Sequence, residues 1–253
     1  MVSEPERGRG PDAAAGGWVE QRPRPERYGL PRVRPGEAPA LILAGVPRGA
    51  RVLDVGCGSG EIGALLRETK GCPVVGVEPQ PERVTAARQR GLEVHEGVLD
   101  ERRADELGPS FDAVLLVDVL EHLADPAALL ETIPRVLAPG ATLHLSVPNV
   151  AHWTLRANLL RGRFRYAEKG LMDATHLRWF TRETLRELLG RTGYHPVAES
   201  ASAGGWLPAY RHLPWRALPS GVRRRTIRWL SRVWPTLFGA QFVVRAVRLR
   251  EES

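Results

Sequence analysis

The sequence predicts an α/β protein built on a mostly parallel β-sheet. From Ala40 onward, short apolar runs alternate with amphipathic stretches, which is the pattern of strands joined by helices. The chain has 253 residues, of which 43% are hydrophobic, so it is long enough for one substantial α/β core with additions. A glycine-rich turn directly follows the first predicted strand, as in α/β proteins that bind nucleotide-like cofactors.

Six strands and four helices are predicted in order along the chain. The helix after Thr181 has this threonine as its N-cap, with Thr184 at the third helical position, and it ends at Gly190 or Gly193. The predicted strands are 51–55, 73–77, 92–96, 112–117, 141–146 and 240–249, and the other helices are 60–69, 80–90 and 125–137.

Composition divides the chain into four parts. Residues 1–37 are dense in Pro, Gly, Arg and Glu, which indicates a disordered or loosely docked arm. The core is predicted over 38–200. Residues 201–239 form a basic helical insertion or cap rich in Trp and Arg, and residues 240–253 form the final strand and tail.

The positive charge is concentrated near the C-terminus. The total is +7, and residues 200–250 contain ten arginines with no Asp or Glu, so the rest of the chain carries −3. Between Val222 and Leu237, apolar positions fall close to one helical face with arginines on the others: 222, 227, 230, 234 and 237. Such a helix suits an anionic membrane surface or a cap with a solvated arginine face. Nucleic acid is a third and less favoured partner, because strand four is not followed by an Asp/Asn-Pro-Pro-aromatic motif.

The sequence favours a cytoplasmic protein. No stretch reaches the roughly 18 apolar residues that cross a bilayer, and the N-terminus lacks an apolar signal-peptide core. Cys57 and Cys72 have no metal-ligand spacing, which argues against a disulfide framework or a zinc site.

A cofactor site is predicted at the first strand and its turn, Asp54-Val-Gly56-Cys-Gly58-Ser-Gly60. Glycines there allow a tight turn and close approach of a ligand, although similar turns also serve plain strand-to-helix packing. Glu78 ends the second strand, where its carboxylate can accept hydrogen bonds from both hydroxyls of a ribose. Asp100 follows the third strand and is placed to meet an adenine amino group.

A nicotinamide or flavin site is the main alternative. Such sites usually follow Gly-x-Gly-x-x-Gly, so that the helix N-terminus receives a pyrophosphate. Here the third glycine comes only two residues after the second, and Glu61 opens the helix. An acidic residue is unfavourable beside pyrophosphate but compatible with a cationic sulfonium cofactor. Asp54, in the strand before the turn, favours the cationic cofactor for the same reason.

These motifs resemble class I S-adenosylmethionine methyltransferases over about residues 40–200: Val52–Gly60, Val75-Gly-Val-Glu78-Pro79, and Phe111 through Leu123 with its Asp118-Val-Leu-Glu121-His122. The resemblance implies a Rossmann-like sheet of seven strands with helices on both faces, plus a helical cap. It also implies that the cofactor is S-adenosylmethionine, with the glycines around its methionine part and Glu78 on its ribose. The implied cofactor-binding residues are Asp54, Gly56, Gly58, Gly60, Glu78, Pro79, Leu99, Asp100 and Asp118.

A hydroxyl acceptor needs a base or a metal ion to remove its proton. The segment after strand four and His176 resemble ubiquinone-biosynthesis O-methyltransferases and small-RNA 2′-O-methyltransferases, in which a Glu-x-x-Glu-His pair and a distant histidine hold a divalent cation. Asp118 replaces the first Glu here. Three alternatives stay open: Mg²⁺ or another divalent cation on Asp118, Glu121, His122 and His176; a metal-free base at His122 or His176; or a structural role for both histidines.

The region after strand five indicates the acceptor. Pro148-Asn149, followed by aromatic and arginine residues up to Thr181, resembles bacterial methyltransferases of cell-surface glycan or secondary-metabolite pathways. This resemblance favours O-methylation of a small hydroxylated or sugar-like acceptor. RNA 2′-O-methylation and a non-catalytic cofactor-binding module at a membrane or partner surface are the alternatives.

Overall fold

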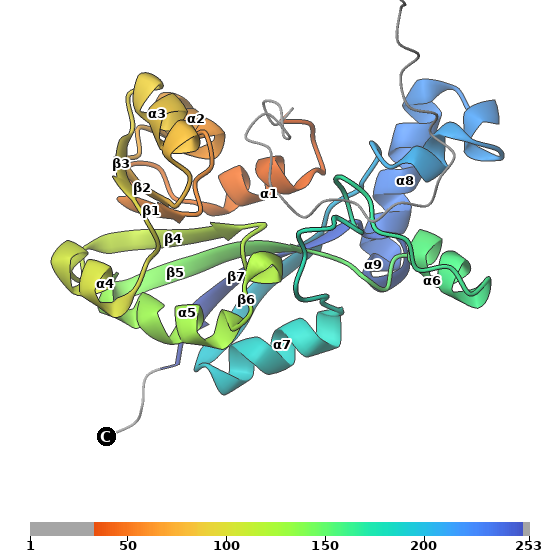
Figure 1. The fold of residues 1–253 in the computed structure, drawn as a ribbon. Helices are drawn as coiled ribbons and strands as arrows, with labels where there is room; N and C mark the ends of the chain where they lie inside the picture. The colour runs from red at the N-terminus through yellow and green to blue at the C-terminus, as the bar shows by residue number, and fades with distance from the viewer. Residues whose placement is uncertain (1–32, 250–253) are drawn as a thin grey trace, which may run out of the picture.

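A seven-stranded sheet forms the centre of the computed structural model, which describes residues 33–249 (Figure 1). The strand order is β3-β2-β1-β4-β5-β7-β6, and all neighbours are parallel except β7, which is antiparallel to β5 and β6. The predicted Rossmann-like sheet is therefore confirmed. Most of the predicted arm 1–37 and the last residues of the predicted tail lie outside the described residues.

All six predicted strands are present. The longest, β5, begins four residues earlier than predicted because its first residues pair with the start of β4. The bounds are β1 Val52–Val55, β2 Val74–Glu78, β3 Glu93–Glu96, β4 Phe111–Val117, β5 Leu137–Pro148 and β7 Gln241–Arg248.

The strand that the sequence pattern did not locate is β6, Tyr194–Ala201. It lies at the edge of the sheet and pairs only with β7, with a shift in register between Pro196 and Ala198. Pro196 is tolerated there because an edge strand leaves part of its backbone unpaired. Only Tyr194 is buried in this strand, so it lacks the apolar run that marks the inner strands.

Helices cover both faces of the sheet (Figure 1). One face carries α1 Ala38–Gly45, α2 Glu61–Lys70 and α3 Pro81–Gln89, and the other carries α4 Glu101–Leu107, α5 Pro126–Thr132 and α7 Arg182–Arg191. Two large hydrophobic clusters fill the layers between helices and sheet. Thr181 caps α7 through a capping box with Thr184, as its position predicted.

Prolines make two helices shorter than the sequence pattern indicated. The helix predicted over 125–137 ends at Thr132 and continues as the 3-10 helix η3 Ile133–Arg135, which contains Pro134. The pattern over 222–237 is divided between α8 Ser220–Val233 and α9 Pro235–Phe238, because a proline cannot extend a preceding α-helix.

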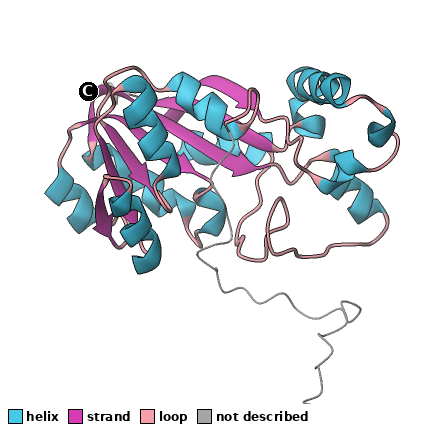
Figure 2. Ribbon diagram, turned by 90° about the horizontal axis from the view of Figure 1, so that it is seen from above, coloured by secondary structure: helices cyan, strands magenta, loops and turns pink. Residues whose placement is uncertain are grey.

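A helical cap lies at one end of the sheet and is visible on the right in both views (Figures 1 and 2). It contains α6 Trp153–Leu160, the 3-10 helices η4 Pro208–Arg211 and η5 Trp215–Ala217, and then α8 and α9. The cap has a small hydrophobic cluster of its own, which includes Leu155, Tyr210 and Ile227. Within residues 33–249, no helix combines the length and apolar character needed to cross a membrane.

Candidate active site

A cavity of about 2290 Å³ opens at the carboxyl ends of the parallel strands, between the core and the cap. Binding sites in open α/β sheets lie at this edge. All the predicted site residues except Gly60 line the cavity, so the structure gathers the two predicted groups, cofactor-binding and catalytic, around one space.

Two glycines of the turn after β1, Gly58 and Gly60, differ in why the position requires glycine. A Cβ atom on Gly60 would lie 2.6 Å from Leu92 Cδ1 and 2.9 Å from Ala87 Cβ, so this glycine is needed where α2 packs against its neighbours. A Cβ on Gly58 would meet no atom within 4 Å. Both residues have a positive φ, 80° and 56° respectively, which favours glycine. Gly58 therefore presents bare backbone to the cavity, as a closely bound cofactor requires.

Glu78 joins the glycine turn to the second strand. Its Oε2 accepts a hydrogen bond from the backbone N–H of Gly58 at 2.9 Å, and its Oε1 accepts one from the N–H of Gln80 at 3.1 Å. The side chain is only 3% exposed, yet it lines the cavity. Each carboxylate oxygen can accept further bonds, so Glu78 is fixed in place with acceptor capacity left for a ribose diol.

Negative charge collects beneath the glycine turn. Asp54 is buried, and burial together with the nearby charges of Glu78 and Glu61 raises its pKa to about 7. Such a group of carboxylates is costly for the protein alone and becomes favourable when a cation binds beside it. The electrostatics of this site thus suit a positively charged ligand and disfavour a pyrophosphate.

Cofactor affinity is expected to depend on pH through Asp54. Because the raised pKa is about 7, Asp54 is largely protonated below that pH and must lose its proton before it can stabilise a cationic ligand. We expect the dissociation constant for S-adenosylmethionine to rise about tenfold between pH 8 and pH 6. Isothermal titration calorimetry would measure this change. In Asp54→Asn the affinity for S-adenosylmethionine at pH 8 should be lower, and it should no longer depend on pH between 6 and 8. An unchanged dependence on pH would contradict the role of Asp54.

The third strand supplies the predicted adenine side. Leu99 is buried at 6% exposure and lines the cavity together with Asp100. Asp100 is also the N-cap of α4, where its Oδ1 accepts a hydrogen bond from the N–H of Arg103 at 2.8 Å. The capping bond fixes the orientation of this carboxylate at the rim of the cavity.

Asp118 stands apart from the other proposed metal ligands. Its backbone has φ 55°, and Oδ1 accepts a hydrogen bond from Ser146 Oγ at 2.6 Å. Gln241 Nε2 donates to both carboxylate oxygens, at 2.7 and 2.8 Å. The residue is open to the cavity that it lines, and desolvation by the surrounding protein raises the pKa of its carboxyl group. The set of four ligands is therefore not assembled here, because Gln241 and Ser146 hold Asp118.

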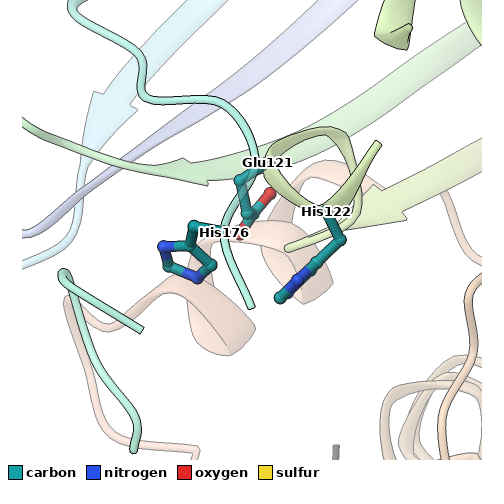
Figure 3. Close-up of side chains that lie close together, drawn as sticks. All are labelled: Glu121, His122 and His176. Atoms are coloured by element: carbon teal, nitrogen blue, oxygen red, sulfur yellow. The ribbon is translucent and has the colours of Figure 1, made fainter. Parts of the chain in front are cut away.

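Glu121, His122 and His176 do come together (Figure 3). The first two belong to the 3-10 helix η2 Leu120–His122 after β4, and His176 projects from the loop that faces it. One ligand atom from each residue lies within 4.8 Å of the others. The rings of His122 and His176 are edge to face, with centroids 5.0 Å apart. The structure thus unites residues separated by more than 50 positions in the sequence.

Backbone hydrogen bonds hold the two parts of this cluster together. The carbonyl oxygen of Glu121 accepts bonds from the N–H groups of Leu177 and Arg178, at 2.7 and 3.0 Å. His122 Nδ1 lies 3.1 Å from the carbonyl oxygen of Thr175. Since a carbonyl only accepts, Nδ1 carries the proton in this contact, and the Nε2 lone pair is free to bind a cation or accept a proton.

The donor set fits a divalent cation. Glu121 is 1% exposed, and its two carboxylate oxygens have no hydrogen-bond partner within the part of the chain that the structure describes. Burial, followed by the charges of Asp118 and Asp173, raises its pKa well above the usual value. A buried carboxylate is normally paired, protonated or bound to a metal. One carboxylate and two imidazoles are a common ligand set for transition metals and zinc.

Three further polar residues in this region have structural partners. His144 lies within β5 and His152 is the N-cap of α6; burial lowers the pKa of each to about 4. Asp173 Oδ1 accepts hydrogen bonds from both the N–H and the Oγ1 of Thr175, so it orients the residue that contacts His122.

Several cavity residues were not predicted. Gln241 opens the last strand and reaches Asp118 only because β7 runs antiparallel beside β5. Its polar side chain at the start of an apolar strand is the one signal in the sequence. Others come from the segment before α1, the loop between α6 and α7, and the cap with the residues just before it: Arg34, Glu37, Lys169, Thr175, Trp206, Tyr210, Arg211 and Arg223.

Comparison with known proteins agrees with this site. Residues 31–199 match a family described as "Methyltransferase domain". A ubiquinone biosynthesis O-methyltransferase of Xanthomonas oryzae is 40% identical over 107 residues, which are 40% of this chain and 44% of that protein. The chain therefore matches less than half of the length of this relative.

Solved structures show the same fold. A methyltransferase in complex with the Haloferax volcanii Trm112 activator has a TM-score of 0.56 at 24% identity, covering 84% of this chain and 89% of that one. A methyltransferase of Thermotoga maritima has a TM-score of 0.54 at 20% identity, covering 84% and 88%. The family match extends over both the glycine turn and the Glu121–His176 cluster, and the chain belongs to the methyltransferase-domain family as a class I S-adenosylmethionine-dependent methyltransferase.

Proposed function

We propose that this chain is a cytoplasmic O-methyltransferase that methylates a hydroxyl group of a small phenolic or sugar-like acceptor, with a divalent cation held by Glu121, His122 and His176. The single observation that carries the proposal is the position of this cluster. It lines the same cavity as Glu78 and Gly58, so an acceptor bound at the cluster would face the cofactor.

The cofactor supplies a methyl carbon already activated by a sulfonium sulfur. On transfer, the acceptor oxygen would form the new bond to carbon, the carbon–sulfur bond would break with its electrons passing to sulfur, and the hydroxyl proton would pass to a base of the site or to water. Positioning therefore accounts for much of the catalysis, and the acceptor proton is the remaining obstacle. A cation at the cluster would lower the pKa of a bound hydroxyl, and the Thr175 contact would keep His122 in the required tautomer.

The cap end of the cavity suits a ring-shaped acceptor. Trp206, which is 42% exposed, lines it together with Lys169, Arg211 and Arg223, so this end offers an aromatic surface and hydrogen-bond donors. The partial relatives that are named O-methyltransferases support the same type of reaction. The experiment must distinguish this proposal from two alternatives, which are RNA 2′-O-methylation and cofactor binding without methyl transfer.

The test combines isotope-labelled S-adenosylmethionine with the full chain and a panel of catechols, free and nucleotide-linked sugars, and short RNA. Mass spectrometry would locate the label. We expect label on a hydroxyl oxygen of a small acceptor, lost with a chelator and restored by Mg²⁺, Mn²⁺ or Zn²⁺. Label on nitrogen, carbon or RNA, or no transfer at all, would contradict O-methylation of a small acceptor. Transfer that persists after chelation would exclude a role for the cation, and a histidine would then be the base.

A further inference from the structure

The helix α8 has an apolar stripe that nothing in the described chain covers. Val222, Trp229 and Val233 are spaced i, i+7 and i+11, so they lie on one helical face, and they are 51%, 55% and 47% exposed. The opposite face is buried through Ile227 and Ser231, each 1% exposed. The sequence pattern had placed Val222 and Ile227 on the same face. The structure separates them, so α8 is apolar on both its inner and its outer side.

The outer stripe continues past the end of α8 as an aromatic row. Trp234 is 54% exposed, and its ring centroid lies 6.4 Å from that of Trp229 and 6.1 Å from that of Phe238. Pro235 ends the preceding helix and begins α9, which places these rings in sequence along one edge of the cap. We call the five residues Val222, Trp229, Val233, Trp234 and Phe238 the outer ridge.

Positive charge borders the outer ridge. Arg225 and Arg232 are exposed and seven residues apart, so both lie beside the stripe on the same flank. Neither is part of an ion pair within residues 33–249, whose ion pairs all involve residues of the core. The sequence contains no Asp or Glu from Ser200 to Arg250 that could neutralise them.

The neighbouring helix of the cap repeats this composition. Leu160, at the end of α6, is 90% exposed, and Leu159 and Phe164 beside it are about half exposed. Residues 153–167 contain four arginines and no acidic residue. In Figure 1, α6, α8 and α9 lie together at one end of the molecule. Exposed apolar groups, and arginines outside any ion pair of residues 33–249, thus occur on α8 and at the C-terminal end of α6, at the same end of the molecule.

Isolated exposed apolar residues are normal on protein surfaces, but a continuous row with two tryptophans is not explained by capping the core. A helix that lies on a membrane has this combination: an apolar face with Trp at the level of the headgroups, and flanking arginines that attract anionic lipids. We propose that the outer ridge docks the cap onto an anionic membrane surface. The proposal rests on the cap alone and does not depend on which acceptor is methylated.

Docking would set the orientation of the active-site cavity. Arg223 belongs to α8 and lines the cavity, as do Trp206 and Arg211 from the preceding part of the cap. The cap side of the cavity would therefore lie close to the lipid headgroups. The enzyme would then be held where an acceptor attached to lipid is concentrated.

The test is sedimentation of the full chain with vesicles. We expect at least about tenfold stronger binding to vesicles containing phosphatidylglycerol than to pure phosphatidylcholine, decreasing as salt rises. Trp229→Ser with Trp234→Ser, and separately Arg225→Gln with Arg232→Gln, should each weaken binding to the anionic vesicles at least about fivefold. The matched control is Arg102→Gln, an exposed arginine on α4 that is distant in sequence from the cap and does not line the cavity.

Affinity for S-adenosylmethionine should remain unchanged in both variants, which distinguishes lost docking from lost folding. Equal binding to both kinds of vesicle, or unchanged binding by the arginine variant, would overturn the proposal. The same holds if vesicles do not bind while a labelled single-stranded RNA does, and the variants abolish that RNA binding. In that case the outer ridge would be a nucleic-acid surface.

Discussion

Glu78→Ala is expected to raise the dissociation constant for S-adenosylmethionine by about two orders of magnitude or more. A hydrogen bond to a charged group contributes about 1.5–3 kcal/mol, and the variant would remove the acceptor predicted for two ribose hydroxyls at once. It also releases the backbone N–H of Gly58, whose contact at 2.9 Å fixes the turn against the second strand. Calorimetry or equilibrium dialysis would measure the loss.

A matched control is available four residues further on. Glu82 is exposed in the first turn of α3 and does not line the cavity, so Glu82→Ala should bind the cofactor as the unaltered chain does. Glu78→Gln keeps the shape and one acceptor oxygen and should fall between the two. If Glu78→Ala binds within about threefold of the unaltered chain, the ribose contact is absent.

Glu121→Gln and His176→Ala are expected to reduce methyl transfer by about two to four orders of magnitude while cofactor affinity changes less than about twofold. The cluster and the glycine turn are separate parts of one cavity, so damage to the first should leave the second intact. His195→Ala on the edge strand β6 is the control, because this histidine is exposed and does not line the cavity. Transfer at an undiminished rate in His176→Ala would exclude His176 from catalysis.

Glu121→Gln should also change stability, in the opposite direction from activity. Burial raises the pKa of Glu121, so the folded state is penalised progressively as pH rises above the value of the unfolded chain, near 4.5. Glutamine carries no charge, so the melting temperature of the variant should exceed that of the metal-free chain, with a difference that grows with pH. Adding Mn²⁺ should raise the melting temperature of the unaltered chain and not that of the variant.

Much of the sheet and of the cofactor side could be predicted because their signals are local. Buried parallel strands produce apolar runs, and Gly58 and Glu78 follow such runs directly. The edge strand β6 was not located because it is mostly exposed and contains Pro196. Periodicity fails where a strand buries few side chains.

The proposed catalytic side of the cavity was harder to predict because its contacts are long-range. Sequence order groups Asp118 with Glu121 and His122, but the positive φ of Asp118 and the amide of Gln241 direct its carboxylate elsewhere. Gln241 is separated from Asp118 by 123 positions, and only the sheet order brings them together. The prediction of one apolar face over 222–237 was wrong for another reason. Apolar periodicity does not distinguish a helical face that packs inward from one that remains exposed.

The insertion of β7 between β5 and β6 has a consequence for how the protein is made. Residues 241–248 are synthesised after the other six strands of the sheet, yet they occupy an interior position in it and deliver Gln241 to Asp118. The glycine turn and the strands around it can form during synthesis. The opposite wall of the cavity can form only after residues 241–248 have been synthesised. A nascent chain stalled before residue 241 would therefore have the elements of the cofactor site and lack the clamp on Asp118.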